Sequence, residues 1–439
     1  MISVPDLSRY HRALAASSLR EASGVVARVI GLTIAATGPA VPVGDTVRVC
    51  TRHGERLAVV TGFRDGEVLL QTLDSVDGIR PGDRVVAGEG PLTIAVGPSL
   101  IGRVVDALGR PLDGRGPLAG AARRPLRAAP PPPLSRRPIR DLLETGIRAI
   151  DALFTIGHGQ RIGIFAGSGV GKSTLLGELA QHAQAAVNVI ALVGERGREV
   201  GEFLDKCLGP QGLARSVVIA ATSDRPAVER LAAAYAAHAV AEHFRDAGHR
   251  VILMMDSLTR VCQAQREIGL AAGEPPVTRG YPPSAFAILP GLLERAGTCA
   301  GAGAITGIYT VLIEGDDEND PIGDSVRAII DGHLFLSRRL AGQAIYPAID
   351  PTLSVSRLLV DLASADDYRL AMRARELWSE YERVRDLVEV GAYRAGADPR
   401  VDQAIAAYPK IVQWLRQGIG EATPRREAIA ALRQIVGAA

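Results

Sequence analysis

The chain has 439 residues, of which 47% are hydrophobic, and its formal net charge is only +2. A chain of this length can form two or three compact units, each with a buried core. The nearly balanced charge argues against a surface devoted to nucleic acid or another polyanion. The four cysteines are far apart and form no CxxC pair. This favours free thiols in a reducing compartment over a disulfide framework or a zinc site.

The first 23 residues predict a short amphipathic helix or arm. Leu7, Tyr10 and Leu14 recur at about helical spacing among charged residues. The sequence leaves open whether this helix packs on its own domain or docks to a partner. No continuous apolar core of a signal peptide is present here, and no stretch reaches the ~18 to 20 apolar residues of a membrane-crossing helix. We therefore expect a cytoplasmic protein.

Residues 24–90 predict a small β-barrel or sandwich. Short β-branched runs, such as VVARVIGLTIAA and DTVRVC, alternate there with Gly, Pro and Asp turns. The connecting region that follows contains AAPPPPLSRRPIR, whose four prolines favour a rigid extended connector. A proline ligand for a partner protein is the alternative interpretation of that segment.

Residues 91–365 predict an α/β domain. RIGIFA, NVIALVGE and VILMMD have the pattern of buried strands, and helical patterns such as STLLGELAQHA lie between them. Alternating strands and helices indicate a parallel sheet covered on both faces. Residues 366–439 are rich in Ala, Arg, Glu and Leu without strand signals, so we expect a C-terminal helical domain.

The strongest motif is the segment QRIGIFAGSGVGKSTLLGEL, residues 160–179. The pattern G-x-x-x-x-G-K-[ST] between a strand and a helix forms a phosphate-binding loop. Alanine replaces its first glycine here, but the remaining glycines still let backbone N–H groups turn toward phosphate oxygens, and the helix N-terminus adds its dipole. The predicted nucleotide-binding residues are Ala166, Gly167, Ser168, Gly169, Val170, Gly171, Lys172, Ser173 and Thr174.

Within this loop, Lys172 is expected to reach the terminal phosphates and Ser173 to ligate Mg²⁺. Two carboxylates follow other predicted strands. Asp256 ends VILMMD and is the expected metal holder, with a helix cap as the alternative role. Glu195 ends NVIALVGE and is the candidate for orienting the attacking water, because phosphoryl transfer depends mainly on positioning and charge neutralisation. An ion pair with a neighbouring arginine is its alternative role.

Two residues of the segment YPAIDPTLSVSR are further candidates. Arg357 could stabilise charge on the γ-phosphate, as an arginine finger does; a surface or ion-paired arginine is the alternative. Tyr346 could be a core aromatic or a plate on which a base stacks.

Together these segments resemble the rotary-type hexameric ATPases, and within them the ATPases of bacterial flagellar and type III protein export. The resemblance runs from about residue 24 to residue 420. It rests on TGIRAID, GQRIGIFAGSGVGKS, GERGREV, MMDSLTR, QREIGLAAGEPPVTRGYPPS, LLERAG, TVLIEGDDENDPIGD, DGHLFLSR, YPAID and SVSR. Alanine at the first loop position is common in the export branch, and GAYRAGADPRVDQAI is more similar to the flagellar members.

The resemblance implies a small N-terminal β-barrel, a central RecA-like P-loop NTPase core and a C-terminal helical domain. It also implies Mg-dependent ATP hydrolysis by a homohexamer that energises protein export. By position, Glu195 activates water, Arg196 and Arg260 support the phosphate pocket, Tyr346 stacks on adenine, and Arg357 enters the neighbouring subunit's site. Lys172 binds the β- and γ-phosphates, Ser173 the metal, and Asp256 the metal through water.

The resemblance further implies several partners: a stator-like negative regulator at the N-terminal helix, a central stalk protein, the export gate, and export substrates with their chaperones. The protein would then be cytoplasmic and peripheral to the inner-membrane export apparatus. The chain departs from the family pattern at Gly201, Val261, Cys262 and Gly291, which leaves the phosphate chemistry intact but bears on activity level and ring contacts.

Three other functions remain open from the sequence. A catalytic subunit of an ion-translocating rotary ATP synthase would share all of this chemistry and differ only in export-type segments such as GEPPVTRGYPPS. A hexameric RNA translocase would need aromatic residues on the barrel for base stacking, and residues 24–90 contain only Phe63. A nucleotide-binding but inactive structural subunit would be expected to lack Glu195.

Overall fold

The computed structural model describes residues 21–120, 122–313 and 320–437. They form two compact units. The first extends to Leu92 and includes Leu270–Glu274, and the second comprises the rest of the chain from Thr93. The amphipathic helix predicted for the first 23 residues falls almost entirely outside the described residues.

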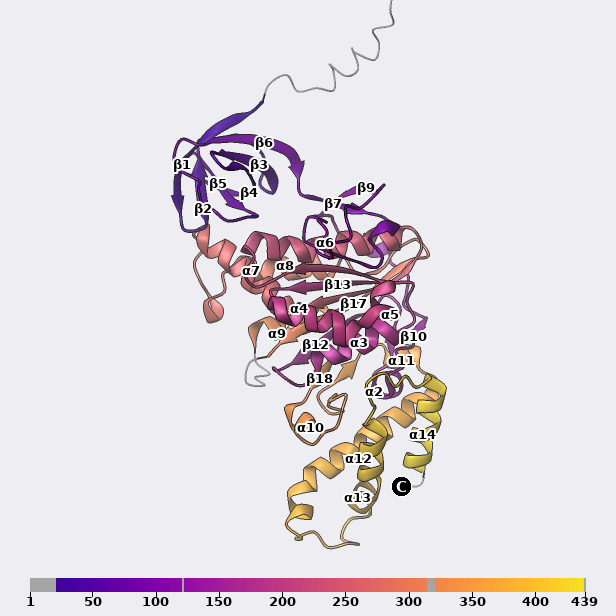
Figure 1. Ribbon diagram of the computed structural model, residues 1–439. Helices are drawn as coiled ribbons and strands as arrows, with labels where there is room; N and C mark the ends of the chain where they lie inside the picture. The colour runs from indigo at the N-terminus through magenta and orange to yellow at the C-terminus, as the bar shows by residue number, and fades with distance from the viewer. Residues whose placement is uncertain (1–20, 121, 314–319, 438–439) are drawn as a thin grey trace, which may run out of the picture. The chain divides into compact units, whose positions relative to one another are not determined.

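The first unit contains a closed six-stranded barrel (Figure 1), with the strand order β1-β2-β5-β4-β3-β6. Its core is filled by alternate side chains of each strand; Val47 and Val49, for example, are buried, whereas Arg48 between them is half-buried and bonds Glu55. This alternation is the period-2 pattern of a strand with one face inward. The strands are β1 (Ser23–Ile30), β2 (Thr33–Ala36), β3 (Asp45–Thr51), β4 (Gly54–Arg64), β5 (Glu67–Thr72) and β6 (Arg84–Pro91).

The second unit is built on a nine-stranded sheet with the order β19-β18-β12-β17-β15-β13-β14-β8, and β16 pairs with β17 outside this path. All pairings from β18 to β8 are parallel, and only β16 and β19 are antiparallel. The strands are β8 (Arg103–Val105), β12 (Arg161–Ala166), β13 (Val187–Val193), β14 (Ser216–Ala221), β15 (Arg250–Asp256), β16 (Gly297–Thr298), β17 (Ala304–Leu312), β18 (Gly332–Leu336) and β19 (Val355–Ser356).

Helices cover both faces of this sheet. Successive strand residues point to opposite sides, so apolar side chains on both faces need covering. Ile308 of β17 belongs to the apolar core that contains α3 (Lys172–His182), whereas the next residue, Tyr309, meets His238 of α6 (Ala227–Asp246). The other helices of this part are α2 (Arg148–Leu153), α4 (Gly197–Glu202), the π-helix η3 (Phe203–Leu208), α5 (Gly209–Ala214), α7 (Leu258–Ala271), α8 (Pro283–Leu293), α9 (Pro321–Ile329), α10 (Arg338–Gly342) and α11 (Leu359–Leu362).

Short elements complete the edges of this unit. Strands β7 (Thr93–Val96) and β9 (Ala122–Pro125) pair with each other, as do β10 (Leu142–Leu143) and β11 (Ile156–Gly157). Single 3₁₀ turns lie at η1 (Pro98–Leu100), η2 (Pro133–Ser135) and η4 (Thr278–Gly280).

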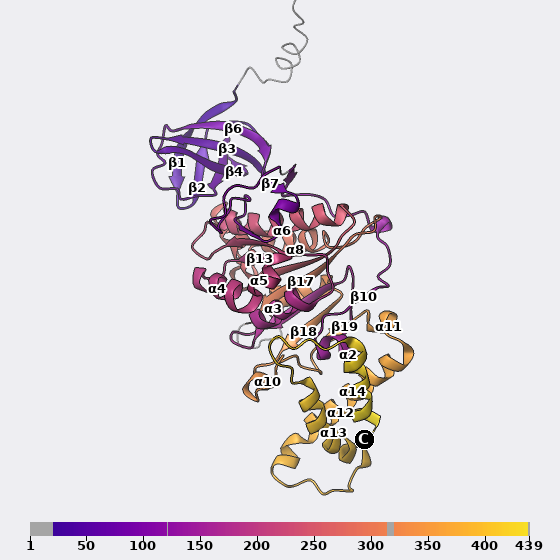
Figure 2. The same ribbon diagram turned by 45° about the vertical axis from the view of Figure 1, so that its right-hand side comes forward.

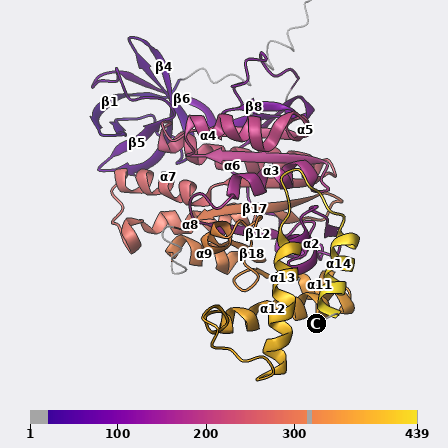
Figure 3. The same cartoon turned by 60° about the horizontal axis from the view of Figure 1, so that its bottom comes forward.

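Three C-terminal helices follow the sheet: α12 (Ala365–Glu389), α13 (Pro399–Leu415) and α14 (Arg425–Gly437). Figures 2 and 3 show them beside α2. Trp378, Trp414 and Leu432 share one apolar core with Leu176 of α3, so these helices pack on the α/β layer rather than standing apart. Within the described residues, no helix is both long enough and apolar enough to cross a membrane. The α/β fold with an N-terminal barrel and a helical C-terminal region is confirmed.

Asp151 in the first turn of α2 organises the junction between these layers. Its carboxylate is 1% exposed and accepts hydrogen bonds from the Thr145 amide (2.9 Å), the Thr145 hydroxyl (2.7 Å) and the Gly146 amide (2.9 Å). Burial raises the pKa of Asp151 to about 6, although these three donors favour its charged form. The carboxylate therefore accepts hydrogen bonds from backbone amides that would otherwise have no partner.

Replacing Asp151 with alanine should lower the free energy of unfolding of the α/β unit by about 2 to 4 kcal/mol, because two buried amides lose their acceptor. Urea denaturation followed by tryptophan fluorescence measures the change. Asp386→Ala is the control, because that side chain is 90% exposed and its loss should change stability by less than about 0.5 kcal/mol. Equal stability of the two variants would contradict this role for Asp151.

Candidate active site

The predicted phosphate loop connects β12 to α3 at the carboxyl edge of the sheet. Gly169 (φ 79°) and Gly171 (φ 90°) adopt left-handed backbone conformations, and α3 begins directly afterwards at Lys172. Ala166 is the last residue of β12 and pairs with both neighbouring strands. Because its backbone is part of the ladder and has no positive φ, alanine fits where the general pattern has glycine.

Lys172 joins two carboxylates that come from other strands. Its Nζ forms an ion pair and hydrogen bond with Asp256 and lies 3.9 Å from Oε1 of Glu195. Asp256 ends β15, and Glu195 lies two residues beyond β13, the strand next to it. Parallel strands bring their carboxyl ends to one edge, which is where ligands bind in open α/β sheets. The structure thus brings together three of the predicted site residues.

Asp256 is held in a fixed position beneath this edge. The residue is 3% exposed, and its Oδ1 accepts a hydrogen bond of 2.7 Å from the hydroxyl of Thr310 on β17. Thr310 is fully buried and lies in the strand next to β15. Sequence reasoning missed Thr310, and only its position near the end of an apolar strand could have indicated it.

Glu195 has an unusual protonation equilibrium in this setting. Burial and the negative charge of Asp256 raise the pKa of its carboxyl, the positive charge of Lys172 lowers it, and the resulting pKa is about 7. A hydrogen bond with Glu199 of α4 also favours the protonated form, and the same bond holds the pKa of Glu199 below its ordinary value. A carboxyl whose pKa is close to neutral can accept a proton or release it under ordinary conditions. Glu199 was not predicted from the sequence.

The two predicted supporting arginines occupy different positions. Arg260 of α7 is half-buried and packs beneath the turn before Glu195, since a side chain on Gly194 would lie 3.0 Å from its Cβ. Arg196 points outward: its side chain is 81% exposed and lies 3.6 Å from Glu199. In this structure Arg260 therefore borders the Lys172 cluster, whereas Arg196 faces solvent.

Tyr346 lines a cavity of about 540 Å³ beside the phosphate loop. Its ring lies about 3.5 Å from the position that a Cβ on Gly171 would occupy. Gly169 and Thr174 line the near side of this cavity, and residues after α13, which the sequence did not indicate, line the far side. The residues not predicted are Ile147, Leu175, Glu178, Ala344, Pro347, Arg416, Gln417, Gly418, Ile419 and Glu421.

Hydrogen bonds from backbone amides after α13 hold the far side of this cavity against Tyr346 and α3. The Gln417 amide donates to the Tyr346 carbonyl (2.8 Å), and the Gly420 amide donates to the Glu178 carboxylate on α3 (3.0 Å). Ile419, between Gln417 and Gly420 in the chain, is 81% exposed and lines the same cavity as Tyr346. A mostly apolar slot next to a phosphate-type loop has the shape and chemistry for a planar base.

Arg357 lies at the opposite edge of the sheet. It follows β19, whose Ser356 pairs with Gly332 at the start of β18, whereas the phosphate loop leaves β12 opposite Leu336 at the end of β18. Four strand residues separate these levels, which is about 13 Å. Arg357 is exposed and donates to the Arg327 carbonyl (3.2 Å). Within one chain, Arg357 is therefore not part of the Lys172 cluster.

Comparisons with known proteins agree with this architecture over almost the whole chain. Family models match for the ATP synthase alpha/beta family nucleotide-binding domain (residues 146–356), its beta-barrel domain (residues 26–87) and the T3SS EscN ATPase C-terminal domain (residues 363–434). The flagellum-specific ATP synthase of Bacillus subtilis (strain 168) is 50% identical over 417 residues, which covers 94% of this chain and 95% of the relative. The chain belongs to the family of flagellar and type III secretion ATPases.

Other relatives come from both branches of this family. The type 3 secretion system ATPase of Xanthomonas euvesicatoria is 49% identical over 408 residues, covering 92% of each chain. Among solved structures, the assembled ATPase EscN of enteropathogenic E. coli has a TM-score of 0.89 at 44% identity and covers 94% of this chain and 100% of its own. The predicted RecA-like core, barrel and helical domain are therefore confirmed as the fold of this family.

The raised pKa of Glu195 can be tested without any activity measurement. Carbon-13 NMR of chains labelled at glutamate Cδ should show a carboxyl that titrates at about pH 7 and disappears in Glu195→Gln. Asp256→Asn should lower this pKa, because it removes a negative neighbour, and Lys172→Met should raise it, because it removes a positive one. Shifts of the same sign in both variants, or no carboxyl that titrates near neutral pH, would contradict the proposed electrostatics.

Proposed function

We propose that the chain catalyses Mg²⁺-dependent ATP hydrolysis in a ring of six identical subunits and that this energises protein export by a flagellar or type III secretion apparatus. The observation that carries the proposal is the meeting of Lys172, Asp256 and Glu195 at the carboxyl edge of a parallel sheet, at the start of a phosphate-loop helix. Near full-length similarity to flagellum-specific and type 3 secretion ATPases supports the same activity.

In the proposed reaction a water oxygen attacks the γ-phosphorus and forms a new P–O bond. The bond from that phosphorus to the β–γ bridging oxygen breaks, so that ADP leaves with the bond's electron pair. The water proton passes to the Glu195 carboxylate, whose pKa of about 7 suits a proton acceptor near neutral pH. Lys172 and the loop amides neutralise phosphate charge.

Magnesium fits the oxygen donors that this edge offers. Magnesium in nucleotide sites is held by one or two protein oxygens together with substrate phosphates and waters, and Ser173 at the start of α3 and Asp256 supply a hydroxyl and a carboxylate. Within the described residues, no cluster of three or more His, Cys, Asp or Glu could hold a metal without the nucleotide. The ion, when bound, neutralises charge on the β- and γ-phosphates.

We further propose that Tyr346 and Ile419 enclose the adenine ring, since both line the slot beside the phosphate loop. Arg260 would support the turn that carries Glu195, and Arg196 would move toward phosphate only in the nucleotide complex. Because Arg357 lies at the opposite edge of its own sheet, it would serve the site of a neighbouring subunit.

The proposed partners follow those of relatives. EscN has been solved as an assembled ATPase and in complex with its central stalk EscO, so a ring and a stalk-like partner are proposed for this chain. The export gate, substrates with their chaperones, and a regulator at the N-terminal helix remain proposals of the same kind. The protein would be cytoplasmic and peripheral to the export apparatus at the inner membrane.

Two alternatives have less support. The match of residues 363–434 to the T3SS ATPase C-terminal domain favours an export ATPase over an ion-driven ATP synthase subunit. An RNA translocase would need a stacking surface, and Phe63 alone supplies aromatic area on the barrel.

Replacing Glu195 with glutamine should leave ATP binding within about twofold and reduce turnover at least about 100-fold, because the proton acceptor is lost while the phosphate loop is unchanged. Lys172→Ala should abolish turnover. Phosphate release and binding of a fluorescent ATP analogue measure the two effects. Glu202→Gln on the adjacent helix is the matched control and should hydrolyse ATP normally. Turnover of Glu195→Gln near the wild-type rate would mean that another group is the base.

Mixing Arg357→Ala and Lys172→Ala subunits, each inactive alone, should restore activity at about a quarter of the sites, those where random assortment joins an intact loop to an intact arginine. ATPase assays after subunit exchange measure this rescue. Mixing Arg357→Ala with the double variant Lys172→Ala/Arg357→Ala is the control, because no site then gains both groups. The absence of rescue in the first mixture, with rings assembled, would exclude action of Arg357 between subunits.

A further inference from the structure

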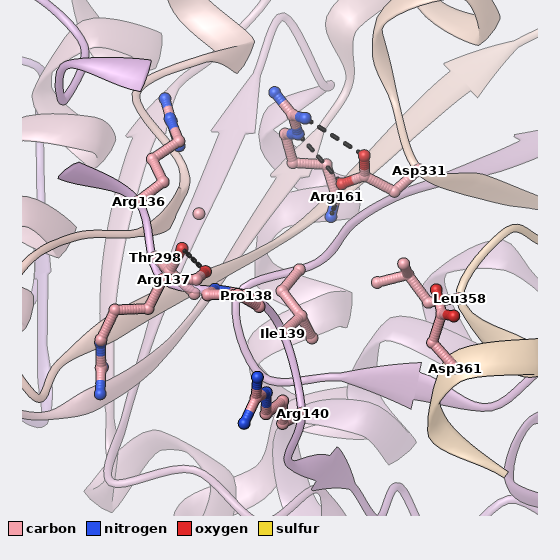
Figure 4. A pocket seen from close by; sticks show the side chains of 12 residues that line it. Arg136, Arg137, Pro138, Ile139, Arg140, Arg161, Thr298, Asp331, Leu358 and Asp361 are labelled. Carbon is pink, nitrogen blue, oxygen red and sulfur yellow. Dashed lines mark hydrogen bonds and ion pairs between the residues drawn. The ribbon is translucent and has the colours of Figure 1, made fainter. Parts of the chain in front are cut away.

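The amino edge of the sheet, opposite the phosphate loop, carries a group of arginines around two adjoining hollows. Figure 4 shows the first, a cavity of about 540 Å³ crossed by residues 136–140. The second, about 560 Å³, shares Arg137 and Arg140 with the first and also contains Arg250, the first residue of β15. Arg161, the first residue of β12, lines the first cavity. We call this region, defined by Arg137, Arg140, Arg161 and Arg250, the arginine furrow.

Glycine backbone and anchored side chains give the furrow a fixed shape. Gly159 (φ 96°) and Gly297 (φ 117°) line it, and a Cβ on either residue would lie within 2.7 Å of a neighbouring side chain. The hydroxyl of Thr298 donates to the Arg137 carbonyl (2.6 Å). The Arg137 guanidinium itself donates to two carbonyl oxygens, those of Cys299 (3.2 Å) and Ala302 (2.9 Å).

The charges of the furrow are only partly neutralised. Arg161 pairs with both Asp331 (3.1 Å) and Glu294, and Arg250 pairs with Asp141 (2.5 Å). By contrast, Arg137 bonds only neutral carbonyls, and across residues 21–120, 122–313 and 320–437 no carboxylate pairs with Arg137 or Arg140. Arginine presents a fork of donors that matches carboxylates, so exposed guanidinium groups without acidic partners suit an external anionic ligand.

The arrangement of these groups indicates what kind of anion fits. In Figure 4 the side chains of Arg137 and Arg140 extend from different positions of the segment 136–140 and do not converge on one point. Asp361 lies across the cavity, beside Leu358. A compact phosphate needs donors that converge on it, whereas a polypeptide can offer carboxylates spaced along its length. Leu134, two residues before the segment 136–140, is fully exposed and adds an apolar contact next to these charges.

We propose that the arginine furrow binds an acidic segment of a partner polypeptide, with carboxylates on Arg137 and Arg140 and an apolar side chain against Leu134. This binding goes beyond ATP hydrolysis, because the furrow and Lys172 lie at opposite edges of the sheet. Complementary charge of this kind sets the association rate and the choice of partner more than it sets affinity. Added salt should weaken the interaction, since these groups are exposed.

The test uses the full chain and a fluorescein-labelled peptide of alternating glutamate and alanine with one central leucine. Fluorescence anisotropy should show affinity falling about tenfold or more in Arg137→Gln/Arg140→Glu, because two charge-assisted contacts are lost. Arg394→Glu/Arg426→Gln changes the net charge equally at two exposed positions, one in the loop between α12 and α13 and one on α14, and should bind normally. Arg140→Glu alone should show a smaller loss; its side chain has no hydrogen bond to any other described residue, so folding is preserved. ATP turnover should be unchanged in all three variants.

Arginine modification by phenylglyoxal, read by mass spectrometry, should show that the peptide protects Arg137 and Arg140 but not Arg394 and Arg426. Four outcomes would overturn the proposal. The first is equal loss of binding in the furrow and control variants. The second and third are protection by inorganic phosphate, or by phosphatidylglycerol vesicles, as strong as protection by the peptide. The fourth is a change in oligomer size in Arg140→Glu, which would make a second copy of the chain the occupant.

Discussion

The ion pair between Lys172 and Asp256, with Glu195 at 3.9 Å, is the constraint on which the site depends. One ammonium group lies beside two carboxylates that have little access to solvent, and the negative charge of Asp256 raises the pKa of Glu195. Removing the positive charge would leave two like charges together, which is costly in a partly buried place. In the proposed reaction the phosphates are a different partner for the lysine, so nucleotide binding would change the electrostatic surroundings of Glu195.

The position of this cluster follows from how α3 packs. α3, which begins with Lys172, lies against η3, which follows Glu195 through α4. Gly177 makes this contact possible: a Cβ there would overlap the carbonyl of Cys207. Any larger residue would separate the helix that carries the lysine from the segment that carries the glutamate. The π-helical turn of η3 widens the helix at this contact, as π-turns often do near functional sites.

Sequence reasoning reached the parts of the site that local pattern determines. The phosphate loop was predictable because glycines, lysine and helix onset are adjacent in the chain, and Asp256 and Glu195 were predictable because they follow apolar strands that form parallel neighbours. Thr310 and Ile419 were not predictable in this way, because each meets the site through contacts between segments far apart in the chain. Glu199 was not predictable because its side-chain bond to Glu195 depends on how both side chains are oriented. The roles of all the site residues, including those that the resemblance gives to Arg196, Arg260 and Arg357, remain predictions.

The same structure suggests how a nucleotide site could influence distant helices. α3 carries Lys172 at its first residue and Glu178 two turns later, and Glu178 accepts the Gly420 amide in the segment between α13 and α14. Arg148 of α2 pairs with Glu421 in that segment and donates to the Trp414 carbonyl at the end of α13. A displacement of α3 would therefore either break the bond between Glu178 and Gly420 or move this segment with it. Since Trp414 and Leu176 share one close-packed core, movement of the C-terminal helices together with α3 preserves that packing.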